Sequence, residues 1–128
     1  METQLPTKEA LNVGQKLVEF CKRGDYVKAV ENLYSPEIES VEAMAMPGMP
    51  DKVKGLEAIR RKNKEWEETM EVHSAQVEGP YPLGDRFAVR FKYDTTDKKT
   101  HQRMQMDEVA VYTVKDGKII KEEFFYTM

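Results

Sequence analysis

The chain has 128 residues, enough for one domain with a single core and too few for two domains of ordinary size. Acidic and basic residues are interspersed and give a net charge of −3, so no basic stripe of the kind that binds nucleic acid is present. No apolar run approaches membrane-spanning length, and the single cysteine, Cys21, excludes an internal disulfide and favours a reducing compartment. These features predict one cytoplasmic domain over residues 1–128 that binds neither nucleic acid nor membranes.

The spacing of apolar residues at the start of the chain predicts two helices. Thr7 is suited to cap the first helix, whose apolar residues recur at spacings of three and four as far as Cys21. Gly24 then supplies a left-handed stop and Asp25 a new N-cap. The second helix, with a stripe that includes Val27, is expected to end before Ser35.

A strand is expected from Ile38 to Met46, and a third helix is expected after Gly55. The predicted inward stripe of that helix comprises Leu56, Ile59, Asn63, Trp66 and Met70. Lys62 falls outside this predicted stripe. Asn63 is informative, because a polar residue on a core face needs a partner or faces a cavity.

The second half of the chain is patterned as strands. The expected strands are residues 72–77, 86–93, about 102–114 and 119–126. Two prolines between Gly79 and Gly84 predict an irregular connection. Clean alternation after Arg86 places Phe87, Val89 and Phe91 on one face. Helices followed by strands indicate an α+β fold and argue against a parallel sheet.

The turn at residues 115–117 is predicted as a three-residue hairpin loop that sets Val114 opposite Lys118. On that register, one face of the last two strands carries Met106, Glu108, Ala110, Tyr112, Ile120, Glu122, Phe124 and Tyr126. The other face carries Asp107, Val109, Val111, Ile119, Glu123 and Phe125. Both faces are partly apolar, so the second face predicts a homodimer.

Four stretches carry a resemblance to a known family: residues 24–34, 54–60, 86–91 and 109–126. Their order resembles that of SnoaL-like proteins in the nuclear transport factor 2-like superfamily. The resemblance implies a cystatin-like conical α+β roll, in which three helices pack on a curved antiparallel sheet around an apolar pocket. It leaves the function open, because this fold hosts isomerases, cyclases, hydrolases and protein-binding domains.

Ketosteroid-isomerase-like members of the superfamily use a tyrosine on the first helix, an aspartate base on the first strand and an aspartate in the long hairpin. The matching positions here hold Leu17, Glu42 with Ala43, and Ala110. The steroid-isomerase set is therefore absent. A carboxylate can still act from Glu42, or from Glu108 two residues along the same strand face.

Three carboxylates are expected to crowd the pocket: Glu42, Glu108 and Glu122. Mutual repulsion and desolvation would raise at least one pKa, which suits a general acid or base. The alternative is that each carboxylate pairs with Arg90, Arg103, a lysine or water at the rim.

The side chains expected to contact a ligand are Asn63, Trp66, His73, Phe87, Val89, Phe91, Met106, Tyr112, Glu122, Phe124 and Tyr126. For His73 a surface position at a strand edge is the alternative, and for Trp66 it is core packing. Neither His73 nor His101 has a spaced carboxylate partner, so we expect no metal, and no cofactor motif is present. Methionines 44, 46 and 49 are predicted to form either a soft lid or a loose loop.

Three functions fit these observations. The first is binding of a small apolar molecule, with or without weak catalysis. The second is a cofactor-independent isomerase, cyclase or hydrolase that uses Glu42 or Glu108 for proton transfer. The third is a protein-interaction module with its pocket filled by its own side chains. A glutamate that titrates near about pH 6 to 7 would favour the enzyme.

Overall fold

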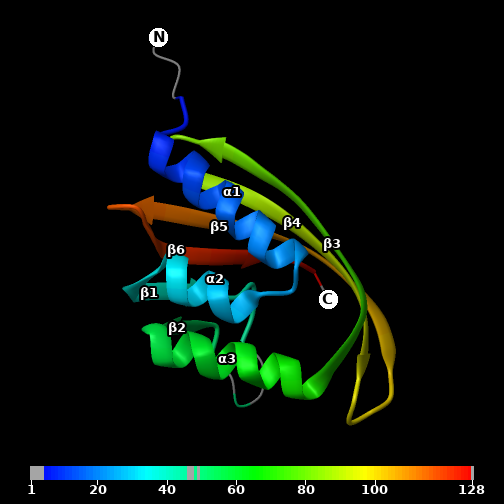
Figure 1. Ribbon diagram of the computed structural model, residues 1–128. Helices are drawn as coiled ribbons and strands as arrows, with labels where there is room; N and C mark the ends of the chain where they lie inside the picture. The colour runs from blue at the N-terminus through cyan, green and yellow to red at the C-terminus, as the bar shows by residue number, and fades with distance from the viewer. Residues whose placement is uncertain (1–4, 46–47, 49, 128) are drawn as a thin grey trace.

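The computed structural model describes residues 5–45, 48 and 50–127, in which three helices cover one face of a curved sheet (Figure 1). The helices are α1 (Lys8–Lys22), α2 (Tyr26–Leu33) and α3 (Leu56–Thr69). The strands are β1 (Tyr34–Val41), β2 (Lys52–Lys54), β3 (Met70–Leu83), β4 (Arg86–Asp97), β5 (Arg103–Lys115) and β6 (Lys118–Phe125). This confirms the predicted α+β roll. None of the described helices is long and apolar enough to cross a membrane.

The six strands lie in the order β2-β1-β6-β5-β4-β3. All neighbours are antiparallel except β1 and β6, which run parallel, so the prediction of a wholly antiparallel sheet is wrong at this pair. Four strands and helix α3 lie between β1 and β6 along the chain, and a connection of that length can return a strand in either direction. Local patterning in either strand therefore carries no information about the pairing.

The helix boundaries follow from their caps. The Thr7 hydroxyl accepts a hydrogen bond from the Ala10 amide at 3.0 Å, and Gly24 adopts a φ of 75° between α1 and α2. Both were predicted. Val27, one of the apolar residues on which the second helix was predicted, is 65% exposed. The inward residues of that helix are Ala29, Val30 and Leu33.

The first strand begins earlier than predicted and is shorter at its far end. Tyr34 follows α2 directly and already belongs to β1, which ends at Val41. The chain then returns as the unpredicted short strand β2, antiparallel to β1. Of the three methionines proposed as a lid, Met44 is exposed, and Met46 and Met49 lie outside the described residues.

Strand β3 runs through the segment that we predicted as an irregular connection. Tyr81 and Pro82 pair with β4, and the ladder shifts register between Glu78 and Tyr81. The prolines are tolerated because β3 is the edge strand, where a missing N–H can face away from the ladder. The turn into β4 is formed by Gly84 and Asp85.

The β5–β6 hairpin has a two-residue turn where we predicted three. Asp116 and Gly117 both have positive φ, at 53° and 74°, and Lys115 pairs with Lys118. A bulge follows between Thr113 and Val114.

Beyond this bulge Ala110 pairs with Phe124 and Tyr112 with Glu122, where we predicted Ala110 opposite Glu122. The displacement is two residues, an even number, so the predicted faces persist away from the turn. Near the turn they do not, because Ile119 is fully buried although we placed it on the outer face.

The core lies between the helices and the inner sheet face. Phe87, Val89 and Phe91 of β4 are buried there, as their alternation predicted. Helix α1 packs very closely on this face at Gly14. A Cβ atom at that position would lie 2.9 Å from the Pro80 Cβ and 3.1 Å from the Phe87 Cγ.

Candidate functional site

Four charged side chains from distant parts of the chain meet on the inner face of the roll. Glu42 follows the end of β1, Lys62 comes from α3, Glu108 from β5 and Glu122 from β6. The site thus joins three carboxylates to a single ammonium group.

Glu122 is the innermost carboxylate, with 4% of its surface exposed. It lies directly beside Ser40 in the parallel pair of β1 and β6, and the Ser40 hydroxyl hydrogen-bonds it. The Tyr34 hydroxyl donates to its Oε2 atom. Burial raises the pKa of Glu122, and Lys62 with the two hydroxyl groups partly offsets that rise.

Lys62 joins two of the carboxylates. Its Nζ forms an ion pair with Glu42, donates to the Ser40 hydroxyl at 2.9 Å, and lies 4.7 Å from the centre of the Phe124 ring. The second oxygen of Glu42 accepts a hydrogen bond from Tyr126 at 3.0 Å. Glu42 therefore has both its oxygens engaged.

Glu108 differs from the other two carboxylates. It is half-buried, and among the described residues it has neither a hydrogen-bond partner nor an ion pair. Burial, followed by the nearby charge of Glu42, raises its pKa from 4.5 to about 7, whereas Lys62 lowers it. Glu108 is thus the carboxyl group of the cluster that the other described side chains leave without a partner.

Aromatic side chains stand beside this carboxyl group. Phe91 is the cross-strand partner of Glu108 and stacks on Tyr93, with ring centres 6.0 Å apart. Tyr93 also contacts Trp66, at 5.9 Å between ring centres, and its hydroxyl lies 3.3 Å from that of Tyr26. Burial raises the pKa of both tyrosines, which keeps them neutral.

The structure brings together Glu108 and Glu122, which strand parity had placed on one face, and Glu42, which the family resemblance had placed in the pocket. Glu42 follows the alternative prediction and pairs with a lysine. Neither predicted arginine takes part, because Arg90 pairs with Asp107 and Arg103 with Asp94. The functional roles of the glutamates stay predictions.

Other predicted ligand contacts are spread more widely. His73 is exposed on the edge strand, where its Nε2 lies 2.7 Å from the Thr96 hydroxyl, so it is not part of the cluster. Phe87 and Val89 are fully enclosed in the core, and Tyr112 stacks on Phe87 at 5.0 Å. The remaining predicted side chains are half-buried: Asn63, Trp66, Met106, Phe124 and Tyr126.

Sequence reasoning missed three members of the cluster. Lys62 was assigned to the outer side of its helix, yet it lies three residues after Ile59 and four before Trp66, the spacing of an inward stripe. Tyr34 was assigned to a helix. Ser40 was not considered, although it shares strand parity with the buried Ile38.

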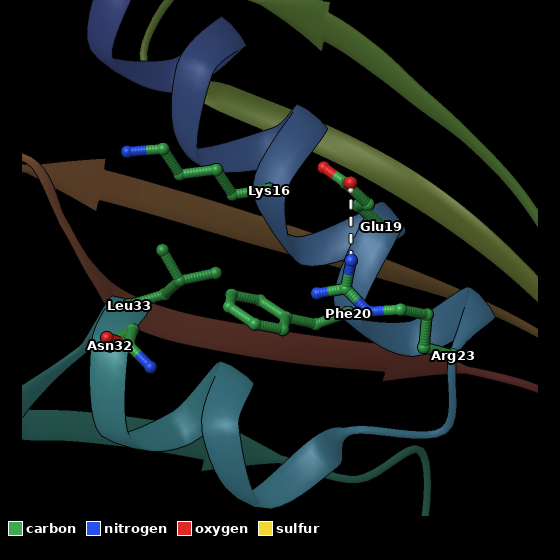
Figure 2. A pocket seen from close by; sticks show the side chains of 6 residues that line it. All are labelled: Lys16, Glu19, Phe20, Arg23, Asn32 and Leu33. Carbon is green, nitrogen blue, oxygen red and sulfur yellow. Dashed lines mark hydrogen bonds and ion pairs between the residues drawn. The ribbon is translucent and has the colours of Figure 1, made fainter.

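Two hollows lie away from this cluster. One of about 350 Å³ lies between α1 and α2 (Figure 2) and is lined by Lys16, Glu19, Phe20, Arg23, Asn32 and Leu33. Another of about 230 Å³ lies toward the β3–β4 turn and is lined by Tyr81, Leu83, Arg86, Phe87, Ala88 and Val111. Neither contains a glutamate of the cluster, so an apolar pocket at the cluster stays a prediction. Over the described residues, no group of three or more His, Cys, Asp or Glu side chains is arranged to hold a metal ion.

The fold is the α+β roll found in solved nuclear transport factor 2-like proteins. The family model for the SnoaL-like domain matches residues 7–126, and the chain therefore belongs to that family. Among curated proteins, none matches the sequence.

Solved structures agree with this assignment. A solved protein from Mesorhizobium loti is 46% identical to this chain, and the match covers 91% of this chain and 97% of that one with a TM-score of 0.86. That protein is described provisionally as a SnoaL-like polyketide cyclase, with the words carbohydrate phosphatase added. A nuclear transport factor 2-like protein from Burkholderia thailandensis is 19% identical over 99% and 92%, with a TM-score of 0.79. A Bacillus subtilis protein described provisionally as an isomerase is 18% identical over 94% and 87%, with a TM-score of 0.74. The last two show the fold alone.

Proposed function

We propose that the chain binds a small, largely apolar molecule at the inner face of its roll and that Glu108 exchanges a proton with it, without a cofactor. The observation that carries this proposal is that Glu108 alone of the three carboxylates has no partner among the described residues. A half-buried carboxyl group with a pKa of about 7 is matched to proton transfer at neutral pH. The neighbouring rings of Trp66 and Tyr93 supply apolar surface for a ligand.

The provisional names of the Mesorhizobium loti relative suggest two chemistries, and the charges favour one of them. Cyclisation of a polyketone requires a base that takes a proton from carbon, which a carboxylate such as Glu108 can provide. A phosphate ester would bring negative charge to three glutamates that are balanced by one lysine. We therefore favour a neutral substrate with an acidic C–H bond.

A generic carbon acid tests the proposal without knowledge of the natural substrate. 5-Nitrobenzisoxazole loses one ring proton to a base, its N–O bond breaks, and a coloured phenolate bearing a nitrile is released. We expect the protein to accelerate this reaction, with a rate that rises with pH through a midpoint near 7. Glu108→Gln should lower the rate about 100-fold, in line with the usual contribution of a general base.

The matched control is Glu65→Gln, which changes an exposed glutamate on α3 in the same way. It should leave both the rate and its midpoint unchanged. Equal rates in the Glu108 and Glu65 variants would contradict acid–base chemistry at Glu108. Binding of the probe without any turnover would leave ligand binding as the function.

A further inference from the structure

The proton-transfer site has one cation for three carboxylates, and the position of that cation decides which carboxylate stays free. Lys62 reaches inward from the middle of α3 and is largely buried. Its ammonium nitrogen contacts the Glu42 carboxylate, the Ser40 hydroxyl and the Phe124 ring. No donor of Lys62 is directed by a hydrogen bond to Glu108.

Two of the three carboxylates have hydrogen-bond or ion-pair partners, and the third has neither among the described residues. Lys62 and Tyr126 hold Glu42 from two sides. Ser40 accepts from Lys62 and hydrogen-bonds Glu122, so the ammonium group acts on that carboxyl through one hydroxyl. Glu108 is left with electrostatic contact only.

We propose that Lys62 is the positioning residue of this site: it fixes Glu42 and Ser40, leaves Glu108 open to a ligand, and supplies the positive charge that allows Glu108 to ionise. This rests on the proposed function in so far as Glu108 is its proton-transfer group. Lys62 itself does not contact the reacting atoms in this proposal.

Ionisable groups from several neighbouring elements interact with Glu108. The ionisable groups that act on it, or on which it acts, are Tyr26 of α2, Lys62 of α3, Tyr93 of β4, Tyr112 of β5, Glu122 of β6, and Glu42 and Tyr126 beyond the ends of β1 and β6. Cys21 of α1 is affected by the adjacent Glu122. Burial raises the pKa of Cys21 and of these tyrosines, so all of them stay neutral at neutral pH. The charge on Glu108 is then governed by two glutamates that oppose its ionisation and one lysine that favours it.

The test is the titration of Glu108 itself, followed by NMR of its side-chain carboxyl carbon and assigned with Glu108→Gln. Lys62→Met removes the charge at nearly the same length and should raise the Glu108 midpoint by about 1 pH unit or more. Lys62→Arg keeps the charge and should leave the midpoint close to that of the parent. Lys64→Met changes an exposed lysine of the same helix and should have no effect.

A second variant separates charge from loosening of the fold. Glu42→Gln removes a negative charge, keeps one oxygen that can accept from Lys62, and presents an amide NH2 that can donate to the Tyr126 hydroxyl oxygen, so it should lower the Glu108 midpoint. Shifts of opposite sign in the Lys62 and Glu42 variants cannot arise from general opening of the site. If Lys62→Met failed to fold, Glu42→Gln and Lys62→Arg would still decide the question.

An unchanged or lowered midpoint in Lys62→Met would overturn the inference, as would a midpoint in Lys62→Arg that moves as far as in Lys62→Met. So would a raised midpoint in Glu42→Gln. None of these measurements needs a substrate. If the parent protein did not turn over the benzisoxazole but the Glu108 midpoints shifted as expected in the variants, only the proposed function would be contradicted. If the parent turned over the probe but the midpoints shifted otherwise, only the role of Lys62 would be contradicted.

Discussion

At the scale of single residues, Glu108 should make the stability of the protein depend on pH. Its pKa is raised from 4.5 to about 7 by burial and by Glu42, so the folded state binds this proton more tightly than the unfolded chain does. The contribution of Glu108 to the free energy of unfolding is then largest below about pH 4.5 and is lost as the pH rises through about 7.

Glu108→Gln stays neutral at every pH and should escape this loss. We expect the variant to be more stable than the parent at pH 8, by about 1–3 kcal/mol after allowance for the partial exposure of the site, and nearly equal at pH 4.5. Urea unfolding at the two pH values measures the difference. A variant that is less stable at pH 8 would show that Glu108 makes a stabilising contact as an anion.

The same residues show what the sequence could and could not predict about the site. Strand parity is a local property, so Glu108 and Glu122 could be placed on the inner face from alternation alone. The spacing of Lys62 from Ile59 and Trp66 allows an inward position, but a rule that treats every lysine as outward excludes it. Its inward position requires Glu42 as a partner, and Glu42 is distant in sequence. A buried charge is tolerated only where a partner exists, and partners come from the tertiary fold.

At the scale of elements, the contact between α1 and the sheet depends on the absence of a side chain at Gly14. The Cβ of an alanine there would approach Pro80 and Phe87 more closely than packed atoms normally allow. Gly14→Ala should therefore destabilise the protein by about 1–3 kcal/mol, even though alanine favours a helix by about 1 kcal/mol over glycine.

Thermal or urea unfolding checks this prediction against Gln15→Ala, a change at the exposed neighbouring position of α1. That control should alter stability by no more than about 0.5 kcal/mol. If Gly14→Ala were as stable as the control or more so, α1 would lie farther from the sheet than the structure shows.

Elements whose form is set locally were predictable, and those set by distant pairing were not. The Thr7 cap of α1, the Gly24 stop between α1 and α2 and the alternation in β4 are set by neighbouring residues. Asp25 stands at the N-cap position of α2 as predicted, but its side chain makes no capping hydrogen bond. The parallel pairing of β1 with β6 depends on the order of strands in the sheet. The prolines within β3 are tolerated because that strand lies at the edge. That information belongs to the order of strands in the sheet and not to any one segment.

At the scale of the whole molecule, the sheet has an outer face that the helices leave uncovered (Figure 1). Two adjoining rows of side chains cross this face. Val109 and Phe125 are cross-strand partners and are 37% and 54% exposed. The next row joins Tyr81, Ala88 and Val111, of which Tyr81 is largely exposed. Exposed apolar side chains that adjoin on one sheet face favour association.

We predict that this face pairs with its own copy to form a homodimer. A two-fold contact sets each apolar row against the same surface of the partner, and the Arg90–Asp107 ion pair beside Val109 can remain at the polar rim. Sedimentation equilibrium at micromolar concentration should give twice the chain mass. Phe125→Lys should give the monomer, because it would bury an unpaired charge at the contact. The matched control is Val27→Lys, which adds the same charge at an exposed position on α2, away from the sheet face, and should stay dimeric. A parent protein that sediments as a monomer would contradict the prediction, and a dimer that survives Phe125→Lys but not Val27→Lys would move the interface to the helical side.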